Sequence, residues 1–257
     1  MNVTAIYFSP TGGTKKYAEA MARAMDENFT AIDLTRPVGR DRAYTFGPED
    51  LVIFGAPVYA GRLPIIAAEA FADIKGENTN AVFLVTYGNR DVDDALMEMK
   101  TICQSSGFRG IAAAALLAEH TYSDKLVGGR PSPADLEETA DFARQIMGKL
   151  ENQNGQDESV IVPGVYPYSK EAKRMPKLTE TGVLCTECGL CVRLCPVGAI
   201  EETADMEANQ EKCIGCLACV KGCPRGGRLV HDPAVLKIRE TLEPIFGGVD
   251  KANRFFI

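Results

Sequence analysis

The chain has 257 residues, of which 46% are hydrophobic and 25% are charged, and its formal net charge is −7 at pH 7. This composition is ordinary for a globular protein with one large domain or two modest ones. The acidic balance disfavours a nucleic-acid partner, and the sequence has neither an apolar run that could span a bilayer nor an N-terminal signal peptide. We therefore expect a cytoplasmic protein with no membrane span and no nucleic-acid partner.

Strand and helix patterns alternate along the first part of the chain. Short, β-rich apolar runs predict strands over residues 3–8, 29–34, 51–58, 81–88 and 111–117. Helical spacing of apolar residues predicts helices over residues 13–27, 92–104 and 132–150. Ser132 and Pro133 favour the start of the last helix, as N-cap and first helical residue. The alternation predicts an α/β fold with a doubly wound, five-stranded parallel sheet.

Changes in composition divide the chain into four parts. Residues 1–150 form the predicted α/β domain, and a polar stretch opens a connector over residues 151–179. A cysteine-rich module follows at residues 180–227. Residues 228–257 predict a tail helix and an apolar terminus that packs on the domains.

Eight of the nine cysteines form two copies of the pattern C-x2-C-x2-C-x3-C-P. This spacing is typical of 4Fe–4S sites, because a tight loop supplies three thiolates and a distant cysteine supplies the fourth. Zinc would leave four of the cysteines without a role, and disulfides are not expected in a chain without a secretory signal. We therefore predict two 4Fe–4S clusters, and we expect Cys103 to be a buried apolar residue.

The cysteine module resembles the two-cluster bacterial ferredoxins, which implies a small α+β domain. In that family the fourth ligand of each cluster comes from the other motif. The resemblance assigns one cluster to Cys185, Cys188, Cys191 and Cys223. It assigns the second cluster to Cys213, Cys216, Cys219 and Cys195.

A short loop rich in glycine and threonine follows the first predicted strand and precedes a helix, with the sequence Ser9-Pro10-Thr11-Gly12-Gly13-Thr14. Its glycines let the backbone wrap around a phosphate, and the helix N-terminus adds free N–H groups. The loop matches neither the Walker A pattern nor the Rossmann pattern. A plain turn that caps a helix is the alternative reading.

This loop resembles the FMN phosphate loop of flavodoxins, [ST]-x-T-G-x-T, and it lies where that family places it. Residues 55–64 and 86–90 follow the third and fourth strands, where flavodoxins hold the flavin ring. The whole chain thus resembles flavodoxin–ferredoxin fusion proteins, which implies FMN as well as the two clusters. The residues assigned to FMN are Ser9, Pro10, Thr11, Gly12, Gly13, Thr14, Pro57, Val58, Tyr59, Ala60, Gly61, Thr86, Tyr87, Gly88, Asn89 and Arg90.

The chain has no tryptophan, which flavodoxins often stack on the flavin. Tyr59 is the first candidate to cover a ring face and Tyr87 the second, with a core or surface tyrosine as the alternative. Arg62 or Arg90 could place positive charge near the flavin, or form a surface salt bridge instead. His120 is a candidate proton donor, and a structural loop histidine is the alternative.

The sequence favours an electron-transfer protein that couples the clusters to FMN and docks to a redox partner protein: a ferredoxin, a flavoprotein or a reductase. The alternative is an FMN-dependent reductase of a quinone, tetrapyrrole or aromatic, with residues 119–133 as a lid over the flavin. A homodimer is a further arrangement, in which flavin and cluster meet across two chains. The direction of electron flow is not readable from these residues.

Overall fold

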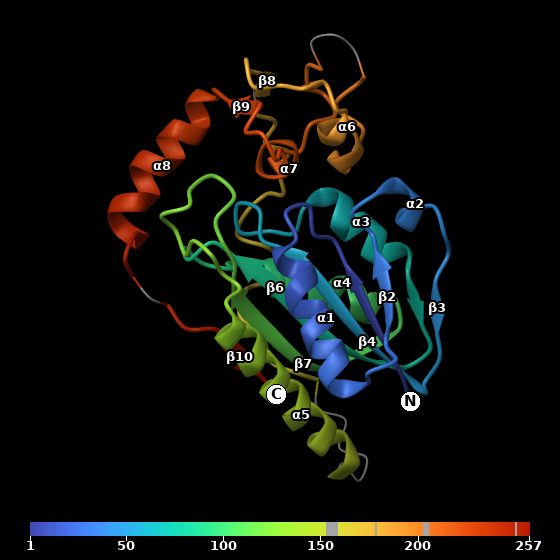
Figure 1. The fold of residues 1–257 in the computed structure, drawn as a ribbon. Coiled ribbons are helices and arrows are strands. Elements are labelled where there is room, and N and C mark those ends of the chain that lie inside the picture. Colours follow the sequence, from blue (N-terminus) through green and yellow to red (C-terminus); the bar gives the residue numbers. More distant parts are fainter. Residues whose placement is uncertain (153–158, 178, 203–205, 250) are drawn as a thin grey trace.

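Six strands form the main sheet, in the order β10-β7-β6-β4-β1-β2. The computed structural model describes residues 1–152, 159–177, 179–202, 206–249 and 251–257. Figure 1 shows the sheet at the centre, the cysteine module above it and the helix α8 along one side. The five predicted strands are present and parallel, as β1 (Asn2–Tyr7), β2 (Thr30–Asp33), β4 (Asp50–Pro57), β6 (Thr79–Tyr87) and β7 (Phe108–Leu117). The predicted α/β fold class is therefore confirmed.

Helices cover both faces of the sheet, which explains why its central strands are apolar along their whole length. One face packs against α1 and α5, and the opposite face packs against α3 and α4. Cys103 on α4 is fully buried, as expected, in the apolar core between the sheet and helices α3 and α4. The four helices are α1 (Gly13–Met25), α3 (Ile65–Asp73), α4 (Ala95–Ser105) and α5 (Pro133–Asn152).

The sixth strand, β10 (Arg254–Phe256), was not predicted. It pairs antiparallel with β7, so that Arg254 lies opposite Ala115. Without it β7 would be an edge strand with unpaired backbone groups. Phe255 packs against Phe142 of α5, with ring centroids 4.6 Å apart. A strand of three residues is too short to show an alternation of apolar and polar side chains. The sequence therefore indicated only an apolar terminus that packs on a domain.

The cysteine module is small and contains little regular structure. Its strands β8 (Thr179–Thr181) and β9 (Arg228–Val230) pair antiparallel, and its helices are α6 (Leu190–Leu194) and α7 (Ala218–Lys221). The tail helix α8 (Pro233–Phe246) follows, capped by the Asp232 carboxylate, which accepts from Ala234 N at 2.8 Å. The remaining short elements are α2 (Pro37–Arg40), β3 (Thr45–Phe46) and β5 (Lys75–Gly76).

The polar boundary predicted at 151–159 lies mostly outside the described residues, because 153–158 are not among them. The four domain limits therefore stay predictions.

Within the described residues, no helix is both long enough and apolar enough to cross a membrane.

Candidate functional site

A cavity of about 480 Å³ lies at the carboxyl ends of β1, β4, β6 and β7. Its volume is within the range of small-molecule and cofactor pockets. Loops that follow the strands of an open α/β sheet meet at this edge, which is why residues far apart in sequence converge here. The predicted FMN residues that line it are Ser9, Pro10, Thr11, Gly13, Thr14, Pro57, Val58, Tyr59, Ala60, Gly61, Thr86, Tyr87, Gly88 and Arg90.

The loop between β1 and α1 has the geometry of an anion site. Gly12 adopts a left-handed conformation, with φ +87°, directly before the 13-residue helix α1. The Ser9 hydroxyl accepts from Lys15 N at 2.9 Å, which folds the loop over the first helical turn. Free N–H groups and the helix dipole at this end favour a phosphate. The loop therefore fits the phosphate group of FMN.

Close packing fixes the same loop against the sheet. The buried hydroxyls of Thr14 and Thr86 lie 2.7 Å apart, which ties the start of α1 to the end of β6. A Cβ added at Gly55 would meet Thr14 Cγ2 at 3.1 Å, so β4 and the loop approach as closely as a glycine allows. These contacts fix the position of the loop against the sheet.

Tyr59 and Tyr87 both line the cavity. Burial raises the pKa of each hydroxyl, so both side chains are neutral at physiological pH. Tyr59 follows β4, whereas Tyr87 ends β6 and also belongs to the apolar core, so Tyr59 is the better placed of the two to cover a flavin ring.

His120 also lines the cavity, where its ring packs against Gly88. Burial, together with the nearby charges of Lys221 and Arg90, lowers the pKa of His120 to about 4. Its Nδ1 accepts from Tyr122 N at 3.1 Å, so Nε2 carries the proton of the neutral ring. His120 is therefore a neutral hydrogen-bond donor at pH 7, and is not a charged acid.

The cysteine module supplies part of the cavity wall. Gly215 and Lys221, from the second motif and its helix α7, are among the lining residues. The Tyr122 hydroxyl donates to the Gly215 carbonyl at 2.9 Å, and Lys221 Nζ lies 2.6 Å from the Glu119 carboxylate. The second motif is thus bonded directly to the loop that follows β7.

The surroundings of the cysteines fit iron–sulfur clusters. Backbone N–H groups donate to cysteine sulfurs in both motifs, from Ala199 to Cys195 at 3.1 Å and from Gly227 to Cys223 at 3.2 Å. Such N–H···S bonds are typical of cluster sites, where they tune the reduction potential. The eight motif cysteines are all unpaired: Cys185, Cys188, Cys191, Cys195, Cys213, Cys216, Cys219 and Cys223.

Arg62 and Asn89, in the predicted flavin loops, bind partners outside the cavity, and Arg62 forms the salt bridge that was its alternative, although a buried one. Arg62 forms a buried pair with Glu98, with N···O distances of 2.8 and 2.7 Å, and its guanidinium lies 4.0 Å from the Tyr168 ring centroid. Asn89 donates to the carbonyls of Phe246 and Val249, and does not line the cavity.

The partners of both side chains come from segments distant in the sequence, since Glu98 lies on α4, Tyr168 in the connector, and Phe246 and Val249 in the C-terminal tail. Gly12 is also absent from the lining, since its role is to turn the backbone.

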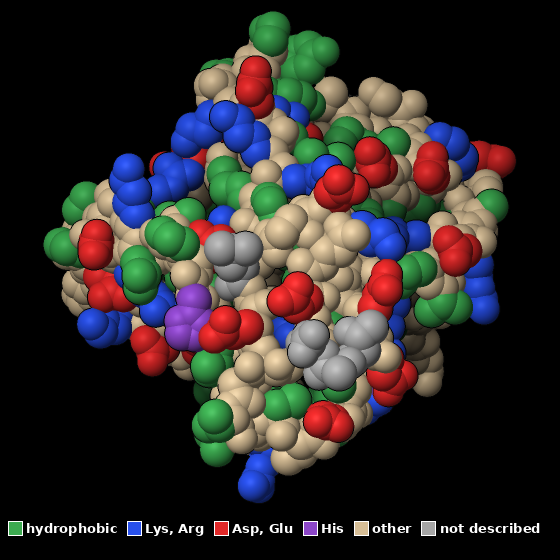
Figure 2. All heavy atoms as spheres, turned by 90° about the horizontal axis from the view of Figure 1, so that it is seen from above, with side chains coloured by type: hydrophobic (Ala, Val, Ile, Leu, Met, Phe, Trp, Pro, Cys, Tyr) green, Lys and Arg blue, Asp and Glu red, His purple; other side chains and the backbone are tan. Residues whose placement is uncertain are grey.

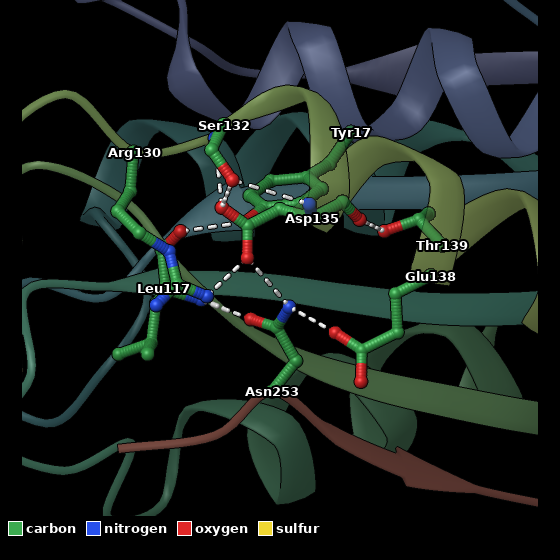
Figure 3. A network of polar contacts seen from close by, with 8 residues as sticks. All are labelled: Tyr17, Leu117, Arg130, Ser132, Asp135, Glu138, Thr139 and Asn253. Carbon is green, nitrogen blue, oxygen red and sulfur yellow. Dashed lines mark hydrogen bonds and ion pairs between the residues drawn. The ribbon is translucent and has the colours of Figure 1, made fainter. Parts of the chain in front are cut away.

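A polar network holds the loop after β7 in place (Figure 3). The Asn253 amide donates to Glu138 at 2.7 Å and to Asp135 at 3.1 Å, and its carbonyl accepts from Leu117 N at 2.9 Å. Asp135 also pairs with Arg130, which lines the cavity. The C-terminal segment is therefore bonded to the end of β7 and to α5, next to residues 118–131, several of which line the cavity. Closure of residues 119–133 over the flavin as a lid stays a prediction.

Sequence analysis missed several residues of the cavity wall. Lys16 lies one turn into α1, and a basic residue there is a weak signal on its own. Met175, Ile238 and Leu242 come from the connector and α8, and only the tertiary structure brings them to the cavity. Asp91 and Ala118 also line the cavity, and no motif indicated them. The remaining lining residues belong to the segment considered as a lid or to the second cysteine motif: Glu119, Thr121, Tyr122, Gly129, Arg130, Pro131, Gly215 and Lys221.

Comparisons with protein families match both parts of the chain. The flavodoxin domain matches residues 4–115, and the 4Fe-4S dicluster domain matches residues 177–233. The chain joins a flavodoxin domain to a 4Fe–4S dicluster domain. This confirms the resemblance to flavodoxin–ferredoxin fusions, and the two domains indicate FMN and iron–sulfur clusters as cofactors.

Several named proteins share similarity with about a quarter of the chain. The probable iron-sulfur protein of the Frd operon of Proteus vulgaris is 36% identical over 29% of this chain and 50% of its own length. The putative oxidoreductase AegA of Escherichia coli is 47% identical over 29% of this chain and 10% of its own length. The E. coli electron transport protein HydN is 41% identical over 18% of this chain and 29% of its own length. This chain therefore spans half or less of each of these relatives.

Among solved structures, oxidised Flavodoxin 2 of Bacillus cereus matches 58% of this chain and 99% of its own, with 13% identity and a TM-score of 0.45.

Proposed function

We propose that this protein transfers electrons between FMN in the cavity and two 4Fe–4S clusters in the cysteine motifs, and exchanges them with a separate redox protein. FMN accepts one or two electrons, and each cluster accepts one. The names of the relatives support this, since HydN is an electron transport protein and the Frd relative is a probable iron–sulfur protein.

The shared wall of the cavity carries the proposal. Gly215 lies between two cysteines of the second motif, and it lines the same cavity as the phosphate loop. Residues 9–14 would hold the FMN phosphate, and Tyr59 and Tyr87 would flank the ring. The eight cysteines would hold the clusters, with the fourth ligand of each exchanged between motifs. The flavin and one cluster would then be neighbours within a single chain.

An anaerobic reductive titration of the reconstituted protein tests this proposal. We expect uptake of about four electrons, two by the flavin and one by each cluster, with flavin and iron–sulfur signals in visible and EPR spectra. Uptake of about two electrons with iron signals but no bound flavin would contradict the FMN assignment of the cavity.

A reductase of a small molecule is the second candidate, and His120 is the observation that favours it. A neutral imidazole with its proton on Nε2 can donate to an oxygen of a bound quinone, and Arg90 and Arg130 line the same cavity. His120→Gln separates the two functions. A reductase loses turnover of a water-soluble quinone while the Kd for FMN is unchanged, whereas a carrier keeps its electron transfer to a protein acceptor.

A further inference from the structure

The two cysteine motifs have equivalent residues in different surroundings. Gly215 and Glu187 occupy the same motif position, and both have positive φ angles, +70° and +53°. A Cβ at Gly215 would lie 1.9 Å from the Met175 carbonyl oxygen, so this position faces the connector and admits only glycine. Glu187 is exposed, which shows that the equivalent position of the first motif faces solvent.

The second motif is buried against the flavodoxin domain. Ile214, Cys216 and Ala218 are buried and belong to the same apolar core as α3 and α4. This side of the module therefore faces the cavity and is closed to a protein partner.

The first motif lies at an open apolar surface. Val183 is fully exposed and Leu184 is 60% exposed, directly before Cys185. Leu229 of β9 is also exposed and packs beside Gly182. Exposed apolar side chains that lie together indicate a surface for a partner. None of residues 183–195, all of which the structure describes, lines the cavity.

Acidic side chains outnumber basic ones in the chain segment that carries this surface. Residues 180–202 include four glutamates and one basic residue, Arg193. Figure 2 looks down on the module, and acidic (red) and basic (blue) side chains are both present on this face. The glutamates, which are all exposed, are Glu180, Glu187, Glu201 and Glu202.

The cluster module covers part of the flavin cavity. The module lies over the carboxyl ends of the strands in Figure 1, where flavodoxin loops would otherwise face solvent. Met175, Ile238 and Leu242 also line the cavity on this side. The first motif is the more exposed motif of the cluster module, so a carrier protein can approach it without entering the cavity.

We propose that the acidic, apolar surface around Val183, Leu184 and Glu187 is the docking site for a one-electron carrier protein with a basic contact surface. This proposal rests on the proposed function. In each encounter one electron passes between the cluster of the first motif and the carrier, with no bond formed or broken. The second motif then exchanges an electron with the first and with the flavin cavity.

Cross-linking with a carbodiimide tests the docking site without measuring activity. The probe is mitochondrial cytochrome c, a basic one-electron haem protein, mixed anaerobically with the flavin- and cluster-loaded protein. We expect cross-links from its lysines to concentrate on the four exposed glutamates of residues 180–202, as located by mass spectrometry. Cross-links at Asp91 or Glu119 of the cavity, or spread evenly over the surface, would overturn the proposal.

Two charge variants make the test quantitative. Glu187→Lys should lower the second-order rate constant for cytochrome c reduction by about threefold or more at low salt, and should weaken its salt dependence. Glu27→Lys, after the end of α1, changes the net charge equally and should leave the rate within experimental error. Equal effects of the two variants would overturn the proposal, provided that both bind normal amounts of iron and flavin.

A double substitution of the exposed apolar residues completes the design of the test. Val183→Ala with Leu184→Ala should weaken docking, whereas Val38→Ala, an exposed valine on α2, should not. If the reductive titration still gives about four electrons but the cross-links and the variants do not behave as expected, the docking site is overturned and the proposed function stands.

Discussion

The two cysteine motifs share one spacing, but one is buried beside the flavin cavity and the other lies at the surface. Spacing decides what a motif can bind, because it sets where thiolates can meet a cluster. The tertiary surroundings decide what the bound group can reach. The difference is visible at a single position, where Gly215 is packed against a carbonyl oxygen and Glu187 faces solvent.

Alanine substitutions at Gly215 and at Glu187 should show the largest difference in FMN binding. Gly215→Ala combines a strained left-handed backbone with a clash against Met175 O, which together cost roughly 4 kcal/mol. The module can relieve this strain by moving off the cavity, so we expect the Kd for FMN to rise about a hundredfold or more. Glu187→Ala should leave the Kd for FMN unchanged. Fluorescence titration with FMN measures the Kd of each variant. Small and equal changes in the two Kd values would contradict the difference between the motifs.

His120, which lines the cavity, extends the comparison to acid stability. The pKa of His120 falls from an unfolded value near 6.5 to about 4, so the unfolded state binds more protons between these values. Stability from this group is full above about pH 6.5 and is lost as the pH falls towards 4, by at most about 3 kcal/mol.

Urea unfolding between pH 7 and pH 5 measures this loss. His120→Gln should flatten the dependence of unfolding free energy on pH. A wild-type slope that survives in His120→Gln would show that His120 is not buried as a neutral ring.

The C-terminal strand braces the cavity by the network that joins it to α5. Asn253→Ala removes hydrogen bonds to Leu117, Asp135 and Glu138, and leaves buried polar groups without a partner. We expect a loss of about 1–3 kcal/mol in unfolding free energy. Asn28→Ala, at an exposed turn, is the matched control and should cost almost nothing. If both variants unfold at the same urea concentration, the strand does not hold the cavity wall.

The hydrogen bond between Tyr122 and Gly215 should give the smallest effect. Tyr122→Phe removes this bond and keeps the ring, so we expect a loss of about 1 kcal/mol, seen as an approximately fivefold higher Kd for FMN. Tyr166→Phe, at an exposed position of the connector, should have no effect. An unchanged Kd in Tyr122→Phe would mean that this contact does not couple the second motif to the cavity.

The sequence predicted the features that local patterns encode. Continuous apolar runs identified the five parallel strands, because strands buried on both faces need apolar residues throughout. The cysteine spacing and the glycine-containing loop indicated the cluster module and the phosphate loop, since both depend on neighbouring residues.

Contacts between distant segments were not predictable. The side chains of Arg62 and Asn89 lie in loops expected at the flavin, but Glu98 and the tail carbonyls bind them instead. The strand β10 forms only because β7 offers a free edge, which no local pattern reports. The wall formed by Gly215 and Tyr122 likewise depends on how the module packs on the flavodoxin domain.

Anaerobic diffraction from crystals of the reconstituted protein, with anomalous signal from iron, tests the central claim most directly. We predict FMN in the cavity, and we predict that the iron atoms nearest to it are bound by Cys213, Cys216 and Cys219. Iron atoms of the Cys185, Cys188 and Cys191 motif nearest to the flavin, or a cavity without FMN, would contradict the account.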